Sequence, residues 1–317
     1  MSAAASTISL PARPRSRAQS PWLRAARRFV DHRGAIVALF LLIIIALFCY
    51  CSLPWSLKHY NSQHLTHALA APSWRHWFGT DRLGRDLLAR FAFGGAISLT
   101  LGFSAALISV VIGVSVGLLA GYAGGRTDAL LMRAVDVLYG LPYILVVILL
   151  RVAVVGRLTN WLAAIRCPDS SGVASVLVLL VGIGGVSWLT MARVIRAQVM
   201  SLRDQPFVEA ARAAGLAPVR IMVRHLFPNL VGVVVVYATL IVPGAILAES
   251  ALSFLGLGVQ PPVPTWGSLA SSGEHAINPI HIRWWLIVWP CAGLSVALLC
   301  LYVVGDALRD ALDPRGG

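Results

Sequence analysis

The sequence has little charge for its length. Of its 317 residues only 12% are Asp, Glu, Lys or Arg, whereas 58% are hydrophobic and the mean hydropathy is +0.78. A soluble domain carries about a quarter of its residues as charged side chains. This deficit and the long apolar runs exclude a water-soluble enzyme and predict a chain that crosses a membrane several times.

Lysine is almost absent, since Lys58 is the only one. An ATP-binding P-loop ends in Gly-Lys-Ser/Thr, so this chain holds no such loop. If ATP drives the protein, ATP and Mg²⁺ must bind to another polypeptide. The formal net charge of +13 is also typical of nucleic-acid binding, but basic residues beside apolar spans are what membrane topology requires. We therefore predict no nucleic-acid partner.

Patterns typical of metal or catalytic sites are missing as well. The five cysteines form no Cys-x-x-Cys pair and are expected to fill apolar space, although one disulfide on the outer side stays open. Four histidines share one loop, but their spacing fits no metal template. They are His59, His64, His67 and His76. We predict no catalytic residue, no metal site and no cofactor in this chain.

Long apolar stretches dominate what is present. A hydrocarbon core about 30 Å thick takes roughly 20 helical residues. The stretches that qualify lie at about 34–53, 95–120, 136–155, 173–195, 229–253 and 284–305. They predict an all-α, polytopic membrane protein with six transmembrane helices. The first stretch is too long for a signal peptide and lacks an Ala-x-Ala site, so we expect a retained helix.

The basic residues predict the orientation. They concentrate in the N-terminal tail (1–33), in the connections after the second and fourth spans, and in the C-terminal tail (306–317). Cytoplasmic loops carry such an excess, so both termini are expected in the cytoplasm. Residues 54–94 then form an outer-side loop, and 95–305 form a core with the other five spans. The beginning of the N-terminal tail reads as disordered.

The segment 203–228 of that core contains helix start and end signals as well as the basic residues that indicate its side of the membrane. Pro206 suits a helix start, and Glu209 lies in the first turn, where the helix dipole favours an acid. Gly215 can end the helix in the left-handed conformation. Pro218 begins a second helical stretch, and Pro228 precedes the fifth span. On these grounds the segment is either an ordinary connector or a short, smooth helix that fits a groove of another protein.

A family resemblance favours the second reading. The segment resembles the "EAA" signature of ABC-importer permeases. The resemblance is carried by Glu209-Ala210-Ala211, by Gly215 and by the ending His225-Leu226-Phe227-Pro228. The resemblance implies that this loop, including Arg220 and Arg224, couples to ATPase subunits. The ending departs from the usual Ile-x-Leu-Pro, and His225 in this place is similar to the dipeptide/oligopeptide/nickel branch.

Three further segments resemble the same branch and cover most of the chain from residue 78 onward. They are Gly79-Thr80-Asp81 with Gly84-Arg85-Asp86, the stretch 248–267, and the stretch 305–315. The pattern resembles the C-type of the two permeases in such importers. It implies a type I permease fold in the bacterial inner membrane, a second permease, two ATP-binding subunits and an external solute-binding protein. Segment 156–172 matches nothing in this pattern.

The resemblance implies import of dipeptides or oligopeptides, with nickel or a nickel chelate as the alternative substrate. An autonomous channel or secondary carrier is the alternative of a different class. Such a carrier needs several ionisable residues inside its spans, and Glu249 is the one acid expected there. Purified and reconstituted alone, an autonomous carrier would still transport.

Several single residues stay open between two roles. Glu249, with Ser250 and a kink at Pro243, either lines a substrate path or is a structural acid. The outer-side residues either contact a binding protein or pair with one another; they are Asp81, Arg82, Gly84, Arg85 and Asp86. A small-residue stripe in the second span packs either within the chain or against a partner permease. Its members are Ser109, Gly113, Gly117 and Gly121, before a helix break at Gly124-Gly125.

Overall fold

The computed structural model describes residues 21–167, 169–274 and 282–312, and these parts of the chain are mostly helical, with the longest mainly non-helical loop at residues 60–86. The predicted disordered tail, residues 1–21, lies outside the described residues except for Pro21, which begins the first helix. In chain order the elements are α1 (Pro21–Asp31), α2 (Arg33–Cys51), α3 (Leu53–His59), the short η1 (Leu65–His67), α4 (Leu87–Ala123), α5 (Gly125–Tyr139), α6 (Tyr143–Ala164), α7 (Ser170–Leu202), α8 (Pro206–Ala213), α9 (Pro218–Ile221), the π-helical η2 (Met222–Leu226), α10 (Phe227–Phe254), α11 (Trp266–Glu274) and α12 (Trp285–Leu312).

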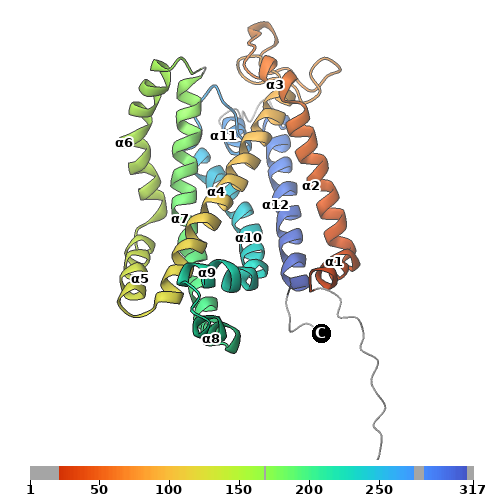
Figure 1. The fold of residues 1–317 in the computed structure, drawn as a ribbon. Helices are drawn as coiled ribbons and strands as arrows, with labels where there is room; N and C mark the ends of the chain where they lie inside the picture. Colours follow the sequence, from red (N-terminus) through yellow and green to blue (C-terminus); the bar gives the residue numbers. More distant parts are fainter. Residues whose placement is uncertain (1–20, 168, 275–281, 313–317) are drawn as a thin grey trace, which may run out of the picture.

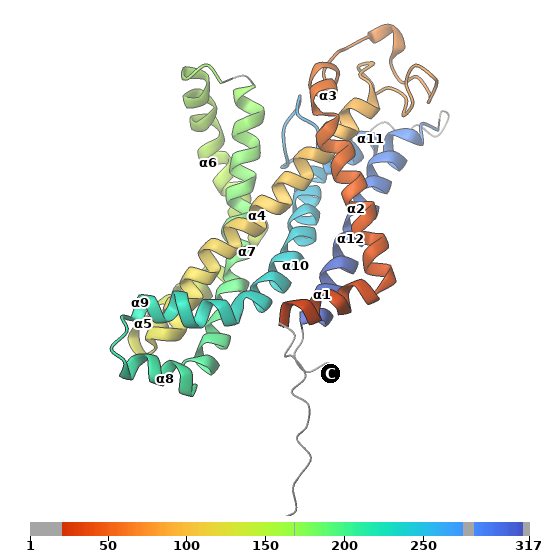
Figure 2. The ribbon, with the colours of Figure 1, turned by 45° about the vertical axis from the view of Figure 1, so that its right-hand side comes forward.

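Six helical segments of the described chain are long and apolar enough to cross a membrane, as the sequence predicts. They are α2, α4, α6, α7, the run from α9 through α10, and α12. Successive segments run in opposite directions (Figure 1). Helices α1, α5 and α8 and the end of α12 lie at one end of the bundle, which we call the basic end. The loop with α3, and α11, lie at the opposite end (Figure 2).

The third span is displaced from its predicted position. It covers Tyr143–Ala164 rather than 136–155, because Pro142 immediately precedes the helix and cannot lie inside one without the loss of a hydrogen bond. The predicted residues 136–139 belong instead to α5, an amphipathic helix at the basic end. Segment 156–172 thereby becomes the last turns of α6, a connection and the start of α7.

The second and sixth spans are longer than predicted. Helix α4 begins at Leu87 rather than 95, since the Asp86 carboxylate accepts a hydrogen bond from the Ala89 N–H (3.0 Å) and caps the helix. The outer-side loop therefore ends at residue 86 rather than 94. Helix α12 continues to Leu312 rather than 305, so most of the predicted C-terminal tail is helical.

The small-residue stripe of α4 packs within the chain. A Cβ added to Gly113 would lie 2.6 Å from the Cβ of Met191, and one added to Gly117 would lie 2.7 Å from the Ala192 carbonyl. Both neighbours belong to α7, so the missing side chains let the two backbones approach closely. The helix break expected after the stripe is confirmed, because α4 ends at Ala123 and Gly124 has φ +63°.

Candidate functional site

Helix α8 is attached to the spans by one narrow apolar face. Val208 is fully buried and Ala211 nearly so, in a cluster with Val199 of α7 and Leu226 of η2. The guanidinium of Arg212 lies 5.2 Å from the centre of a tyrosine ring at the end of α4. These contacts fix α8 as the outermost helix of the basic end (Figures 1 and 2).

The other face of α8 is exposed. It carries the small Ala210 and Ala213 beside Glu209, and the exposed Phe207 and Arg212 flank them. The helix ends as predicted, since Gly215 has φ +74° and the Leu216 N–H donates to the Ala211 carbonyl (3.2 Å). A Cβ added to Gly215 would meet nothing within 4 Å. The structure therefore leaves an exposed surface with free space beside it.

The remaining residues of the segment connect α8 to α10 and differ in exposure. Arg220 and Arg224 are exposed, whereas His225 is half-buried within the π-helical turn that precedes α10. Pro228 lies in the first turn of α10 rather than before it. The π turn packs through Met222 and other apolar side chains into the same cluster as α8, so α8, η2 and the spans share one core.

Two ion pairs tie α5 to α7 near the basic end, and sequence reasoning missed both. Arg196 donates hydrogen bonds from its guanidinium to both carboxylate oxygens of Asp128. These hydrogen bonds hold the pKa of Asp128 below its usual value. One turn earlier on α7, Arg193 donates to Asp136 (2.8 Å) and lies 4.2 Å from the centre of the Tyr139 ring. From the sequence alone these two arginines indicate only which side of the membrane their connection lies on, because nothing there says which acids pair with them.

Glu249 lies deep in the bundle, where it is fully buried. Its Oε1 accepts hydrogen bonds from the hydroxyls of Ser253 (2.6 Å) and Thr265 (2.8 Å). Ser250 packs against Gly267 of α11, where an added Cβ would lie 2.5 Å from the Ser250 Cα. In this arrangement the glutamate joins α10 to the segment that leads into α11. Its part in a substrate path stays a prediction.

A pocket of about 430 Å³ opens between α7, α10 and the connection from α5 to α6. Ser187 and Thr190 of α7 supply hydroxyls, Tyr143 supplies a phenol, and Gly244 and Ala248 of α10 form a smooth wall. Pro243, which precedes Gly244, lies inside α10 and is buried. The pocket therefore adjoins the predicted kink, but Glu249 and Ser250 are not among its lining residues.

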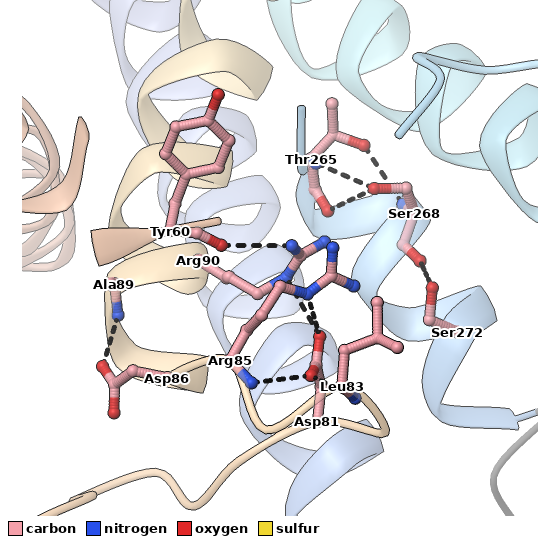
Figure 3. A network of polar contacts seen from close by, with 10 residues as sticks. All are labelled: Tyr60, Asp81, Leu83, Arg85, Asp86, Ala89, Arg90, Thr265, Ser268 and Ser272. Carbon is pink, nitrogen blue, oxygen red and sulfur yellow. Dashed lines mark hydrogen bonds and ion pairs between the residues drawn. The ribbon is translucent and has the colours of Figure 1, made fainter. Parts of the chain in front are cut away.

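The outer-side residues form a compact hydrogen-bonded turn at the opposite end (Figure 3). Asp81 accepts from the backbone N–H groups of Leu83 and Arg85 (both 2.9 Å) and from the Arg85 Nε (2.7 Å). Gly84 has φ +69°, the left-handed conformation that this turn requires. Asp86 caps α4 and lies 3.0 Å from a ring nitrogen of His76. Asp81, Gly84 and Arg85 thus act on one another, whereas Asp86 pairs with His76 and with the start of α4. Arg82 is the exposed one of the five predicted residues.

Arg90 joins this turn, although it is not among the residues selected from the sequence. It lies in the first turn of α4 and only 5% of its surface is exposed. Its guanidinium donates to the Tyr60 carbonyl (3.2 Å), and its Nε lies 3.7 Å from an Asp81 oxygen. Figure 3 shows the Arg85 and Arg90 guanidiniums on the same side of the Asp81 carboxylate. An apolar run flanks Arg90 in the sequence, and a cation there was the available signal.

Comparison with known proteins decides the family. Residues 113–316 match the family described as "Binding-protein-dependent transport system inner membrane component", and residues 20–72 match "N-terminal TM domain of oligopeptide transport permease C". The chain belongs to this permease family.

Curated relatives extend the match to nearly the whole permease. This chain is 43% identical over 299 residues to the "Oligopeptide transport system permease protein OppC" of Escherichia coli (strain K12), and the match covers 94% of this chain and 92% of that protein. It is 40% identical to the OppC of Haemophilus influenzae, over 94% of this chain and 89% of that protein. The "Dipeptide transport system permease protein DppC" of Bacillus subtilis (strain 168) is 40% identical, over 94% and 85%.

These matches confirm the resemblance drawn from the motifs, and with it a multi-pass permease of the inner membrane. They select a binding-protein-dependent transport component over the autonomous channel or carrier. The structure separates the permease's predicted residues into an exposed helix at the basic end, a buried glutamate, and a turn at the opposite end. It adds Asp128, Arg196 and Arg90 to them.

Proposed function

We propose that this permease forms half of the transmembrane path of an ATP-driven importer of dipeptides or oligopeptides. The names of its relatives, which are oligopeptide and dipeptide transport permeases, support this substrate class. A second permease supplies the other half of the path. Two ATP-binding subunits bind and hydrolyse ATP with Mg²⁺, and an external solute-binding protein delivers the peptide. The basic end faces the cytoplasm.

The observation that carries the mechanism is the exposed face of α8 around Ala210 and Ala213. We infer that this face docks in a groove of an ATP-binding subunit, with Glu209 at the positive end of the helix dipole. Because α8 shares its core with α7 and η2, closure of the ATPases moves these spans together with it. A coupling element must contact its partner differently in the two states, and a rigid lever meets that need.

Two variants of α8 test this coupling. Gly215→Val strains the left-handed cap by roughly 1–2 kcal/mol and places a branched side chain in the space beside α8. Glu209→Lys puts a positive charge at the positive helix end. Neither changes a span, so both permeases should still insert. We expect both complexes to lose substrate-stimulated ATP hydrolysis, or to lose the ATPase subunits on purification.

The chain offers a matched control for backbone strain. Gly256, which ends α10, has the same φ of +74°, and an added Cβ there would also meet nothing within 4 Å. Gly256→Val therefore imposes the same strain at the opposite end and should keep ATPase coupling. Equal losses in Gly215→Val and Gly256→Val, or full transport and bound ATPases in both α8 variants, would refute the docking of α8.

We propose further that the peptide passes along the pocket between α7 and α10. Ser187→Trp should fill this pocket and lower peptide uptake while the complex stays assembled.

Glu249→Gln keeps an oxygen for Ser253 and Thr265 but removes the charge. Altered uptake kinetics in Glu249→Gln would assign it to the path, and unchanged kinetics would make it a structural acid. Uptake of a labelled tripeptide, compared with uptake of nickel, distinguishes the two substrate classes.

A further inference from the structure

A second pocket lies at the opposite end of the bundle, away from the proposed peptide path. It has a volume of about 310 Å³ and lies between the turn before α4, the start of α4, α11 and the start of α12. Arg82, Arg85 and Arg90 line it together with Asp81 and Ser272. Figure 3 shows the two guanidiniums of Arg85 and Arg90 across from the serines of α11.

The charges of this pocket do not balance. Asp81 is the one acid among its described lining residues, against three arginines. The Asp81 carboxylate already accepts two backbone N–H groups and the Arg85 Nε. The Arg90 Nε is buried and has no hydrogen-bond partner among the described residues. Its nearest acid is Asp81, whose oxygen lies 3.7 Å from the Arg90 Nε and 2.7 Å from the Arg85 Nε. One carboxylate therefore serves two largely buried arginines, and a second negative group would compensate the remaining charge.

The walls of the pocket indicate what carries that group. Four of its ten described lining residues are leucines: Leu83, Leu87, Leu269 and Leu286. Arg90 and Leu286 lie in the first turns of two membrane spans, α4 and α12. Trp284, which is 47% exposed, immediately precedes α12, and Trp285 is the first residue of that helix. Tryptophan gathers at the level of the lipid headgroups. The arginines thus stand at headgroup level beside an apolar surface.

We propose that this pocket binds the phosphate of an anionic phospholipid, with Arg85 and Arg90 as its ligands. Guanidinium forks match the paired oxygens of a phosphodiester, and the leucines accept the glycerol and the first methylenes. The lipid would neutralise the excess charge and would hold the turn, α11 and α12 together. This site is separate from the peptide path and does not depend on the proposed substrate.

Native mass spectrometry of the delipidated full complex provides the test. Phosphatidylglycerol and phosphatidylcholine are added back separately, and bound lipid is counted. Wild type should retain phosphatidylglycerol in preference to phosphatidylcholine. Arg85→Gln and Arg90→Gln should each weaken this binding roughly tenfold, because each removes a charge-assisted hydrogen bond. Leu83→Trp should block the pocket with all charges in place, and it covers the case in which Arg90→Gln fails to assemble.

Arg75→Gln is the charge control, since Arg75 is exposed on the same loop and lines no part of the pocket. It should bind phosphatidylglycerol like wild type. Equal binding of both lipids by wild type would overturn the proposal, as would an equal loss in Arg75→Gln. Variants that retain phosphatidylglycerol but lose docking of the solute-binding protein would make the pocket a protein contact and would also overturn it.

Discussion

The loops at the two ends of the bundle are held in opposite ways. The loop between α3 and α4 is fixed by polar contacts of its own: the buried Thr80 accepts from the Ala70 N–H (2.8 Å) and donates to the His67 carbonyl, and Asp81 organises the turn after it. Helix α8, at the basic end, is held by the apolar side chains of Val208 and Ala211 and leaves its polar residues exposed.

This difference shows which loop keeps its backbone shape without a protein partner. A loop whose buried backbone groups are satisfied by its own side chains is rigid on its own account. A short helix that is anchored by two apolar side chains has one face fixed to the spans, and its exposed face is available to bind a partner. The loop at the opposite end is thus a rigid cap, whereas α8 is suited to transmit a displacement.

The largest expected effect comes from breaking the anchor of α8. Val208→Asp places a carboxylate at a fully buried position of an apolar cluster, at a cost of roughly 3 kcal/mol or more. Helix α8 should detach, and the complex should lose its ATPase subunits on purification. Val219→Asp adds the same charge to an exposed position of the same segment and should behave like wild type. Retention of the ATPases by Val208→Asp would show that α8 is not anchored by this contact.

A smaller effect is expected from breaking the loop at the opposite end. Thr80→Val keeps the shape of the side chain but leaves the Ala70 N–H and the His67 carbonyl without their partner, which costs about 1–3 kcal/mol. Limited proteolysis should cut between residues 60 and 86 faster, while ATP hydrolysis stays coupled. Thr80→Ser keeps the hydroxyl and should resist proteolysis like wild type. Loss of coupling in Thr80→Val would contradict the contrast between the two ends.

The smallest effect concerns acid. The pKa of Asp128 is lowered in the folded protein because Arg196 donates hydrogen bonds to it. The pair therefore stabilises the protein fully above the ordinary aspartate pKa of about 4, and this contribution is lost as pH falls through the lowered value. Thermal unfolding followed from neutral to acid pH should show a steeper loss for wild type than for Asp128→Asn. Parallel curves would mean that the pair contributes nothing.

Local signals were the reliable part of the prediction. Pro206, Gly215 and Pro218 placed α8 and α9 correctly, because proline and left-handed glycine restrict the backbone whatever surrounds them. The predicted third span is wrong because the apolar run extends back across Pro142 to residues 136–139, whereas the helix does not: α5 ends at Tyr139 and α6 begins at Tyr143.

The sequence by itself determined the number of spans, their alternation and the helix at the basic end, since apolar length, basic residues and helix caps act locally along the chain. The tertiary structure decided which surfaces meet. It placed the glycine stripe against α7, buried Glu249 beneath Thr265, paired Asp128 with Arg196, and brought Arg90 beside Arg85. These contacts join residues far apart in the chain, and they depend on how helices rotate and cross. Side-chain packing fixes those angles, and no local pattern records them.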